Sequence, residues 1–203
     1  MNRWLWAALL GGLMGLPAEA GLVVLDFEDL EYGEVLSGTT YGDISWEFGS
    51  GGYLGRIGYW MTPSSPNGNY PASGQRNLIN CYGDTQLGLA FAHLANIEGA
   101  YFSGQGHPTA WTPAVRVHAY RNGAEVGTTP WLEGISAEPQ WLAIGFDSVD
   151  RLVVEAVPVV SGGGWYGLDD LTFFAHAPEP GTLVLLLGGV GLVARRMRHR
   201  RGS

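Results

Sequence analysis

The sequence contains no lysine and only one cysteine, Cys81. Its 11 basic residues are therefore all arginines, against 19 Asp and Glu, and charged residues make up only 15% of 203 positions. A lone cysteine excludes a disulfide within the chain. The abundant glycine, 32 residues, follows no G-X-Y period and accompanies many aromatic residues, which excludes collagen and favours a turn-rich β protein.

Arginine is also sparse before the C-terminus, because five of the 11 lie in the last nine residues: Arg195, Arg196, Arg198, Arg200 and Arg201. Once Glu19 and Glu179 are set aside, residues 21–177 carry 17 acidic residues against five arginines, a net charge of -12. Proteins bind phosphate backbones through clustered Lys and Arg. We therefore expect no nucleic-acid partner for the central part of the chain.

Residues 1–20 have the pattern of a secretory signal peptide. Arg3 precedes an apolar run over residues 4–16, and Ala18-Glu19-Ala20 places small residues at the two positions that signal peptidase reads. We expect cleavage before Gly21. An uncleaved anchor is the alternative, but the run is shorter than the ~20 residues that span a bilayer.

The C-terminal segment, residues 178–203, has three parts. Pro178-Glu179-Pro180 precedes an apolar run over residues 181–194, and the terminal arginines follow. The positive-inside rule keeps these arginines cytoplasmic, so the run is expected to be a transmembrane helix. Its length of about 21 Å is short of a ~30 Å hydrocarbon core. Such an anchor suits transient use, although snorkelling arginines also permit a retained tail anchor.

This ordered triplet resembles the PEP-CTERM sorting signal of Gram-negative bacteria, and Pro178, Glu179 and Pro180 match the motif that gives the signal its name. The resemblance implies that an exosortase in the inner membrane recognises these residues and cuts nearby. It also implies that the protein crosses the inner membrane in transit and reaches the cell surface or the extracellular matrix.

Between these ends, residues 21–177 show short alternating apolar runs separated by turn residues, which predicts an antiparallel β-sandwich. Asn122-Gly123 between two alternating runs predicts a hairpin. Residues 90–97 are compatible with a helical turn. Strands are expected over 22–27, 115–120, 125–127, 141–146, 151–157 and 171–174.

The central part also resembles a recurring ectodomain of PEP-CTERM proteins, in the segments Leu25–Leu30, Tyr41–Trp46, Tyr120–Gly123, Trp141–Leu152 and Leu168–Phe173. Similar patterns occur in galactose-binding-like, carbohydrate-binding jelly rolls. The resemblance implies a jelly-roll fold and an extracellular polysaccharide as a partner, and it implies the fold more firmly than the ligand.

Four acidic residues lie in or directly beside the first and last expected strands: Asp26, Glu28, Asp169 and Asp170. These strands often lie side by side in a jelly roll, so the carboxylates are expected to converge. Carboxylate oxygens suit Ca²⁺, and the resemblance implies a structural calcium between such strands. The alternative is that these acids are solvated at strand ends, with one aspartate capping a turn.

Two tryptophans, Trp60 and Trp111, lie in Gly-, Pro- and Thr-rich sequence, where exposed rings would stack on sugars. Packing under a loop is the alternative for each. Trp46 and Trp141 lie in expected strands and are predicted to be buried in the core.

Sequence motifs for catalysis are missing, since there is no H-x-x-x-H pair and no G-x-S-x-G. Acidic pairs are numerous, but a sequence does not reveal the ~5–9 Å spacing that glycoside hydrolysis requires. We therefore expect a non-enzymatic exported surface or matrix protein with affinity for carbohydrate. A polysaccharide-active enzyme and a purely structural matrix protein remain alternatives.

Overall fold

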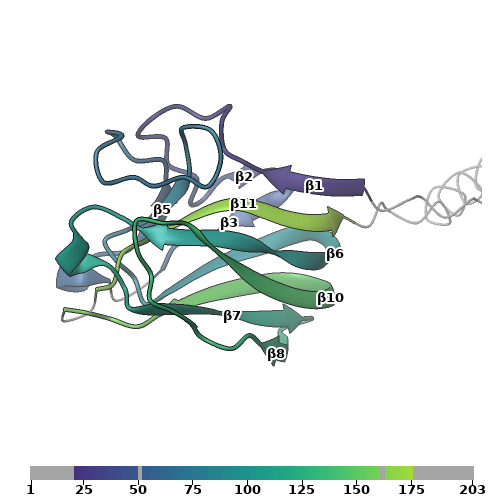
Figure 1. The fold of residues 1–203 in the computed structure, drawn as a ribbon. Helices are drawn as coiled ribbons and strands as arrows, with labels where there is room; N and C mark the ends of the chain where they lie inside the picture. Colours follow the sequence, from purple (N-terminus) through teal and green to yellow (C-terminus); the bar gives the residue numbers. More distant parts are fainter. Residues whose placement is uncertain (1–20, 50–51, 161–162, 176–203) are drawn as a thin grey trace, which may run out of the picture. The chain divides into compact units, whose positions relative to one another are not determined.

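The computed structural model describes residues 21–49, 52–160 and 163–175 (Figure 1). Gly21–Ala175 forms one compact unit. Its strands are β1 (Gly21–Leu25), β2 (Thr40–Tyr41), β3 (Ile44–Trp46), β4 (Tyr59–Met61), β5 (Leu78–Cys81), β6 (Gln86–Gly104), β7 (Ala114–Arg121), β8 (Ala124–Thr128), β9 (Leu132–Glu133), β10 (Gln140–Ala156) and β11 (Tyr166–Ala175). Short 3₁₀ turns, η1 (Tyr53–Gly55) and η2 (Pro108–Ala110), interrupt the connections.

The predicted all-β, antiparallel class is confirmed, because every pairing between these strands is antiparallel. The strand order is β4-β5-β11-β6-β10-β7-β8, with β1 beside β11, β3 beside β6 and β9 beside β7. No helix among the described residues is long and apolar enough to cross a membrane. The predicted signal peptide and the helix over 181–194 lie outside the described residues.

Two long strands, β6 and β10, connect the halves of the sheet. Residues 86–90 of β6 pair with 151–155 of β10, and residues 99–102 pair with 140–143. Three register shifts separate these stretches, and Gly145 and Ser148 adopt positive φ of 64° and 53° there. The strands expected over 141–146 and 151–157 are therefore one bulged strand. The helical turn over 90–97 is wrong, since those residues belong to β6.

The core is aromatic and joins residues far apart in sequence. Trp46 of β3 packs edge-on against Trp60 of β4 at 5.7 Å between ring centroids, and Trp60 packs against Tyr166 of β11 at 5.9 Å. All three are at most 1% exposed. The sheet must therefore fold over a single interior, since β3 and β4 lie far apart in the strand order.

Two local predictions are confirmed. The hairpin between β7 and β8 turns at Asn122 and Gly123, both with positive φ, as a type I′ turn requires. The first and last strands pair directly, with Leu25 opposite Leu171.

Candidate functional site

One outer face of the sheet is rich in polar side chains, because strand residues two apart point to the same side. The opposite side chains of these strands, such as Leu87, Val117 and Leu152, are buried in the core. We call this surface the polar face. It consists of Gln86 and Gly88 of β6, Arg151, Val153 and Glu155 of β10, and Arg116, His118 and Tyr120 of β7.

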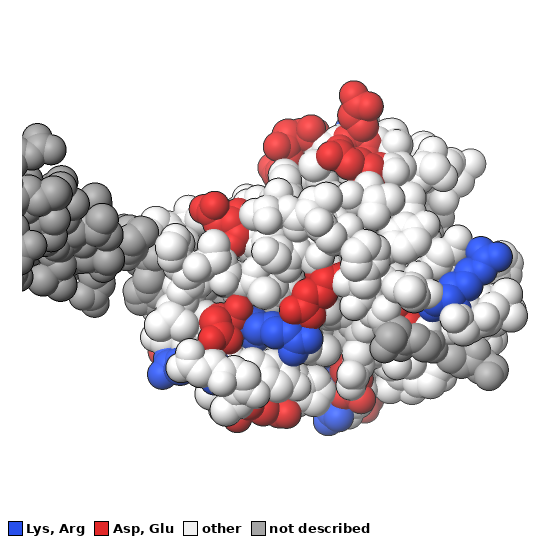
Figure 2. Space-filling view, turned by 180° about the vertical axis from the view of Figure 1, so that it is seen from behind, with Lys and Arg blue, Asp and Glu red and all other residues white. Residues whose placement is uncertain are grey.

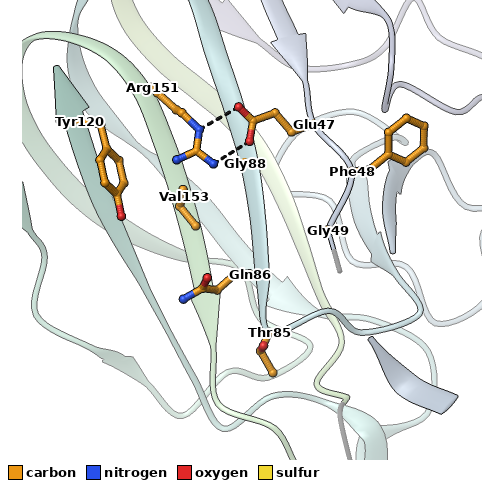
Figure 3. A pocket seen from close by; sticks show the side chains of 9 residues that line it. All are labelled: Glu47, Phe48, Gly49, Thr85, Gln86, Gly88, Tyr120, Arg151 and Val153. Atoms are coloured by element: carbon orange, nitrogen blue, oxygen red, sulfur yellow. Dashed lines mark hydrogen bonds and ion pairs between the residues drawn. The ribbon is translucent and has the colours of Figure 1, made fainter. Parts of the chain in front are cut away.

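A groove of about 230 Å³ lies on the polar face, where β6, β10 and β7 meet the segment after β3. Figure 3 shows Arg151 reaching from β10 toward Glu47, with Tyr120 on one side of it and Gln86 below. Phe48 and Gly49 border the groove on the β3 side. The groove is lined mainly by polar groups, so it suits a polar ligand rather than a lipid.

The groove is organised by an ion pair between Arg151 and Glu47. The Arg151 Nε and Nη2 donate to Glu47 Oε1 and Oε2 at 2.8 and 2.7 Å, the two-pronged geometry that makes such pairs strong. This pairing with Glu47 raises the pKa of Arg151 above its usual range. Gly88 makes room for the pair, because a Cβ there would lie 1.9 Å from Glu47 Oε2.

Several groups in the groove are left for a ligand. Arg151 lies over the Tyr120 ring, 5.3 Å from its centroid, which holds that ring at the groove wall. Within the described part of the chain, the Tyr120 hydroxyl and the Gln86 side-chain amide make no hydrogen bond. Donors and acceptors beside one aromatic ring match the hydroxyls and C–H face of a sugar.

The polar face continues along β7 and β10 as a linked cluster. Glu155 Oε2 accepts from Arg116 Nε at 2.6 Å and lies 2.7 Å from His118 Nε2. Burial alone raises the pKa of Glu155, but the hydrogen bonds from Arg116 and His118 outweigh it and hold that pKa below its usual value. Arg116 also lies 4.4 Å from the Trp131 ring centroid. These contacts fix the side chains next to the groove.

A buried carboxylate supports the groove wall. Asp84 is fully buried, and its Oδ2 accepts from Gly58 N at 2.6 Å, while Gly49 N donates to Gly58 O at 3.0 Å. A Cβ at Gly49, Gly52 or Gly58 would lie 2.0–2.3 Å from an Asp84 carboxylate oxygen, so each must be glycine. Burial raises the pKa of Asp84.

The predicted acidic cluster has a different role from the expected one. Glu28 Oε1 accepts from the backbone N–H of Gln75 and Arg76 at 2.7 and 2.6 Å. Asp169 Oδ2 accepts from Ala72 and Ser73, and its Oδ1 accepts from Asp170 N. These two carboxylates therefore anchor one loop, residues 72–76, against the sheet.

The other two acids are less involved. Asp170 accepts from Ser73 Oγ at 2.8 Å, and exposed Asp26 accepts from the backbone N–H of Glu28 at 3.2 Å. Asp26 thus has the predicted turn-capping alternative role. Burial raises the pKa of Asp169 to about 7, although three backbone N–H groups oppose the shift.

These contacts bear on the calcium prediction. Among the described residues no three Asp, Glu, His or Cys side chains come close enough to hold a metal ion. Glu28 Oε1 and both carboxylate oxygens of Asp169 already accept backbone N–H groups, so an ion bound through these oxygens would compete with those hydrogen bonds. Calcium binding at these acids therefore stays a prediction for experiment.

The tryptophans are distributed differently from the prediction. Trp60 is fully buried in β4, with its Nε1 donating to Gly88 O at 3.0 Å, so the expected exposed platform is wrong. Trp111 is half-buried, packs edge-on against Tyr70 at 5.6 Å and donates to Gly106 O. Trp46 is buried as predicted, but Trp141, expected in the core, is 40% exposed.

The groove is not predictable from the sequence. Glu47 and Arg151 are 104 positions apart, and no motif in the sequence links the two residues. The alternation of Arg116, His118 and Tyr120 was the one available signal, since it places all three on one face of a strand.

The charged residues of the described part of the chain are dispersed over the face that Figure 2 shows. Figure 2 shows the basic residues on one face standing apart from one another, with acidic residues and uncharged surface between them. The described residues offer no run of Arg along which a phosphate backbone would lie.

Several solved structures are similar to this chain at low sequence identity. Similar solved structures include TmCBM61 in complex with β-1,4-galactotriose, at 12% identity over 74% of this chain and 94% of that chain, with a TM-score of 0.42. A second is the K2 cleaved adhesin domain of Lys-gingipain, at 14% identity over 75% of this chain and 99% of that chain, with a TM-score of 0.49. A third is the CBM22-1 xylan-binding domain of Paenibacillus barcinonensis Xyn10C, at 13% identity over 80% of this chain and 99% of that chain, with a TM-score of 0.39. Likeness this remote assigns no ligand to the chain.

The tail gives a more specific result. Residues 176–201 match the PEP-CTERM protein-sorting motif, which confirms the resemblance seen at Pro178, Glu179 and Pro180. The motif indicates export and processing by an exosortase. No curated protein matches the chain.

Proposed function

We propose that the chain is an exported surface or matrix protein that binds a neutral polysaccharide without turning it over. In this proposal the signal peptide directs export, the tail is an inner-membrane anchor in transit, and an exosortase releases residues 21–177 to the cell surface or extracellular matrix of a Gram-negative bacterium. We also propose the finer jelly-roll, galactose-binding-like class, which the pairing of β1 with β11 supports.

The groove on the polar face carries the ligand assignment. It combines a fixed Arg151–Glu47 pair with a Tyr120 ring and with hydroxyl and amide groups that no protein group among the described residues satisfies. A net charge of -12 over residues 21–177 opposes binding of anionic polymers and favours neutral ones.

Retention on polysaccharide tests this function. The full-length chain in detergent is run by affinity electrophoresis through gels containing a soluble β-glucan, a galactan or a xylan. We expect retardation by at least one polymer, and Tyr120→Ala should weaken it by about tenfold, while the matched loop variant Leu54→Ser binds as the original does. Full mobility in all three gels and on a neutral glycan array would favour the purely structural alternative.

The enzymatic alternative is tested in the same samples. Release of reducing ends from a retained polymer, lost in Glu47→Gln or Glu155→Gln, would indicate a polysaccharide-active enzyme. Binding without release supports a binding protein. We expect binding alone, because the Glu47 carboxylate is engaged in its ion pair with Arg151 rather than free for catalysis.

Sorting is tested in cells. We expect the original chain to be shortened and to leave the inner membrane, and Glu179→Ala to remain there at full length. If both chains stay full length in the inner membrane, with or without the exosortase, the tail is a retained anchor and the release model is wrong.

A further inference from the structure

An aromatic pair lies on the other half of β6 and β10, away from the groove. Trp141 of β10 sits directly opposite Tyr101 of β6, and their rings meet edge-on at 5.1 Å between centroids and 63° between planes. Trp141 is 40% exposed, which is unusual for the largest side chain in a sheet. This pair leaves an indole ring open to solvent in the middle of a strand pairing.

The neighbouring residues of β6 and β10 are small, so the Trp141 ring packs closely on the sheet. Gly99 and Ala143 are the next pair along the two strands on the same face. A Cβ at Gly99 would lie 2.4 Å from Trp141 Cζ2, so the indole packs directly on the Gly99 backbone. The glycine thus fixes the ring from beneath, and the small Ala143 adds no bulk beside it. Trp141 and Tyr101 together form an aromatic platform that packs on the sheet.

The groups around the platform limit the chemical classes of ligand that it can bind. Trp141 Nε1 makes no hydrogen bond within the described residues, so it can donate to a ligand. Residues 21–177 carry a net charge of -12, which opposes binding of nucleic acid and anionic lipid at this platform. Two rings are also far smaller than a stable protein–protein interface. A neutral sugar ring, with its C–H face on the indole and a hydroxyl at Nε1, fits these conditions.

We propose that Trp141 and Tyr101 form a second polysaccharide-binding site, so that one domain holds two polymer segments and cross-links them. This inference rests on the proposed function of the groove. The two sites use separate parts of the same strands, since the groove draws on 86–88 of β6 and 151–153 of β10, and the platform on 99–101 and 141–143. Neither site shares a side chain with the other.

A bridging assay tests the proposal. One neutral polymer, the β-glucan, galactan or xylan that retards the chain, is immobilised, and the same polymer carrying a fluorescent label is added with the full-length protein in detergent. We expect the original chain to capture labelled polymer. Trp141→Ala and Tyr120→Ala should each keep some binding to the immobilised polymer, weakened by about tenfold, and each should lose capture.

Controls keep the outcomes separate. Trp141→Phe retains an aromatic ring and should recover part of the capture of labelled polymer. The melting temperature of Trp141→Ala shows whether that variant is folded. Light scattering establishes that the bridging species is one chain rather than a dimer. Unchanged capture by Trp141→Ala, with capture lost in Tyr120→Ala, would overturn the second site and leave the groove standing. If the original chain binds no polymer, the proposed function itself fails, and the second site fails with it.

Discussion

Charged side chains have different roles in two regions of this molecule: ion pairing beside an open groove in one, and anchoring of a loop in the other. On the polar face, Arg151 pairs with Glu47 and Arg116 pairs with Glu155, at the surface beside an open groove. Under the loop of residues 72–76, Glu28 and Asp169 accept backbone N–H groups and close the surface instead. The comparison teaches that the number of carboxylates in a region says little about ligand binding. What decides is whether the backbone already uses their oxygens.

The largest expected effect lies in the loop region. Asp169→Ala leaves three backbone N–H groups, those of Ala72, Ser73 and Asp170, without an acceptor. We expect the free energy of unfolding to fall by about 3 kcal/mol in urea titrations. Asp26→Ala, at an exposed acid, should change it by less than about 0.5 kcal/mol. Equal effects of the two substitutions would contradict the anchoring role.

The next effect alters the groove while leaving the fold intact. Gly88→Ala places a Cβ against the Glu47 carboxylate, which is the end of a flexible side chain and can move away. We expect an unfolding free energy within about 1 kcal/mol of the original, because the pair is partly exposed. Polymer affinity should nevertheless drop about tenfold, as measured by affinity electrophoresis. Retained affinity would mean that the Arg151–Glu47 pair does not shape the site.

A pH effect separates the two regions further. The pKa of Asp169 is about 7 in the folded chain against an ordinary value of 3.8, so the folded chain binds the proton more tightly than the unfolded chain does. Its contribution to stability is therefore largest at low pH and is lost as pH rises from about 4 to 7. We expect Asp169→Asn to be more destabilising, relative to the original chain, at pH 5 than at pH 8. Urea titrations at both values measure the difference, and the reverse order would contradict the buried, proton-binding state.

The smallest expected effect concerns calcium. If the sequence prediction holds, the ion exchanges hydrogen bonds at Glu28 and Asp169 for ionic contacts, so the net gain is small. We then expect about 1 mM Ca²⁺ to raise the melting temperature by about 2 °C over a chelator control, and Glu28→Gln to abolish the rise. No shift in melting and no heat of titration would remove calcium from the account.

Local pattern predicted much of the fold. Alternation located β1, β7 and β11, and Asn122-Gly123 predicted the hairpin, because these features depend on neighbouring residues. The bulges at Gly145 and Ser148 were missed, since they depend on how β10 pairs with β6. Residues 90–97 were missed for the same reason.

The candidate site was far less predictable. The exposure of Trp60 and Trp141 is reversed relative to the prediction, because Trp60 is buried by Trp46 and Tyr166, while the Trp141 indole sits outside on the Gly99 backbone. The groove depends on Glu47 meeting Arg151 across 104 positions. Such contacts arise only when the sheet has formed.

The most direct test of the central claim is the affinity of the full-length chain for a soluble neutral polysaccharide, measured with Tyr120→Ala and Leu54→Ser alongside. Tyr120 borders the groove, and Leu54 is an exposed loop residue outside it. We expect saturable binding that falls about tenfold in Tyr120→Ala and is unchanged in Leu54→Ser. Equal binding by all three chains, or none by the original, would contradict a glycan site on the polar face.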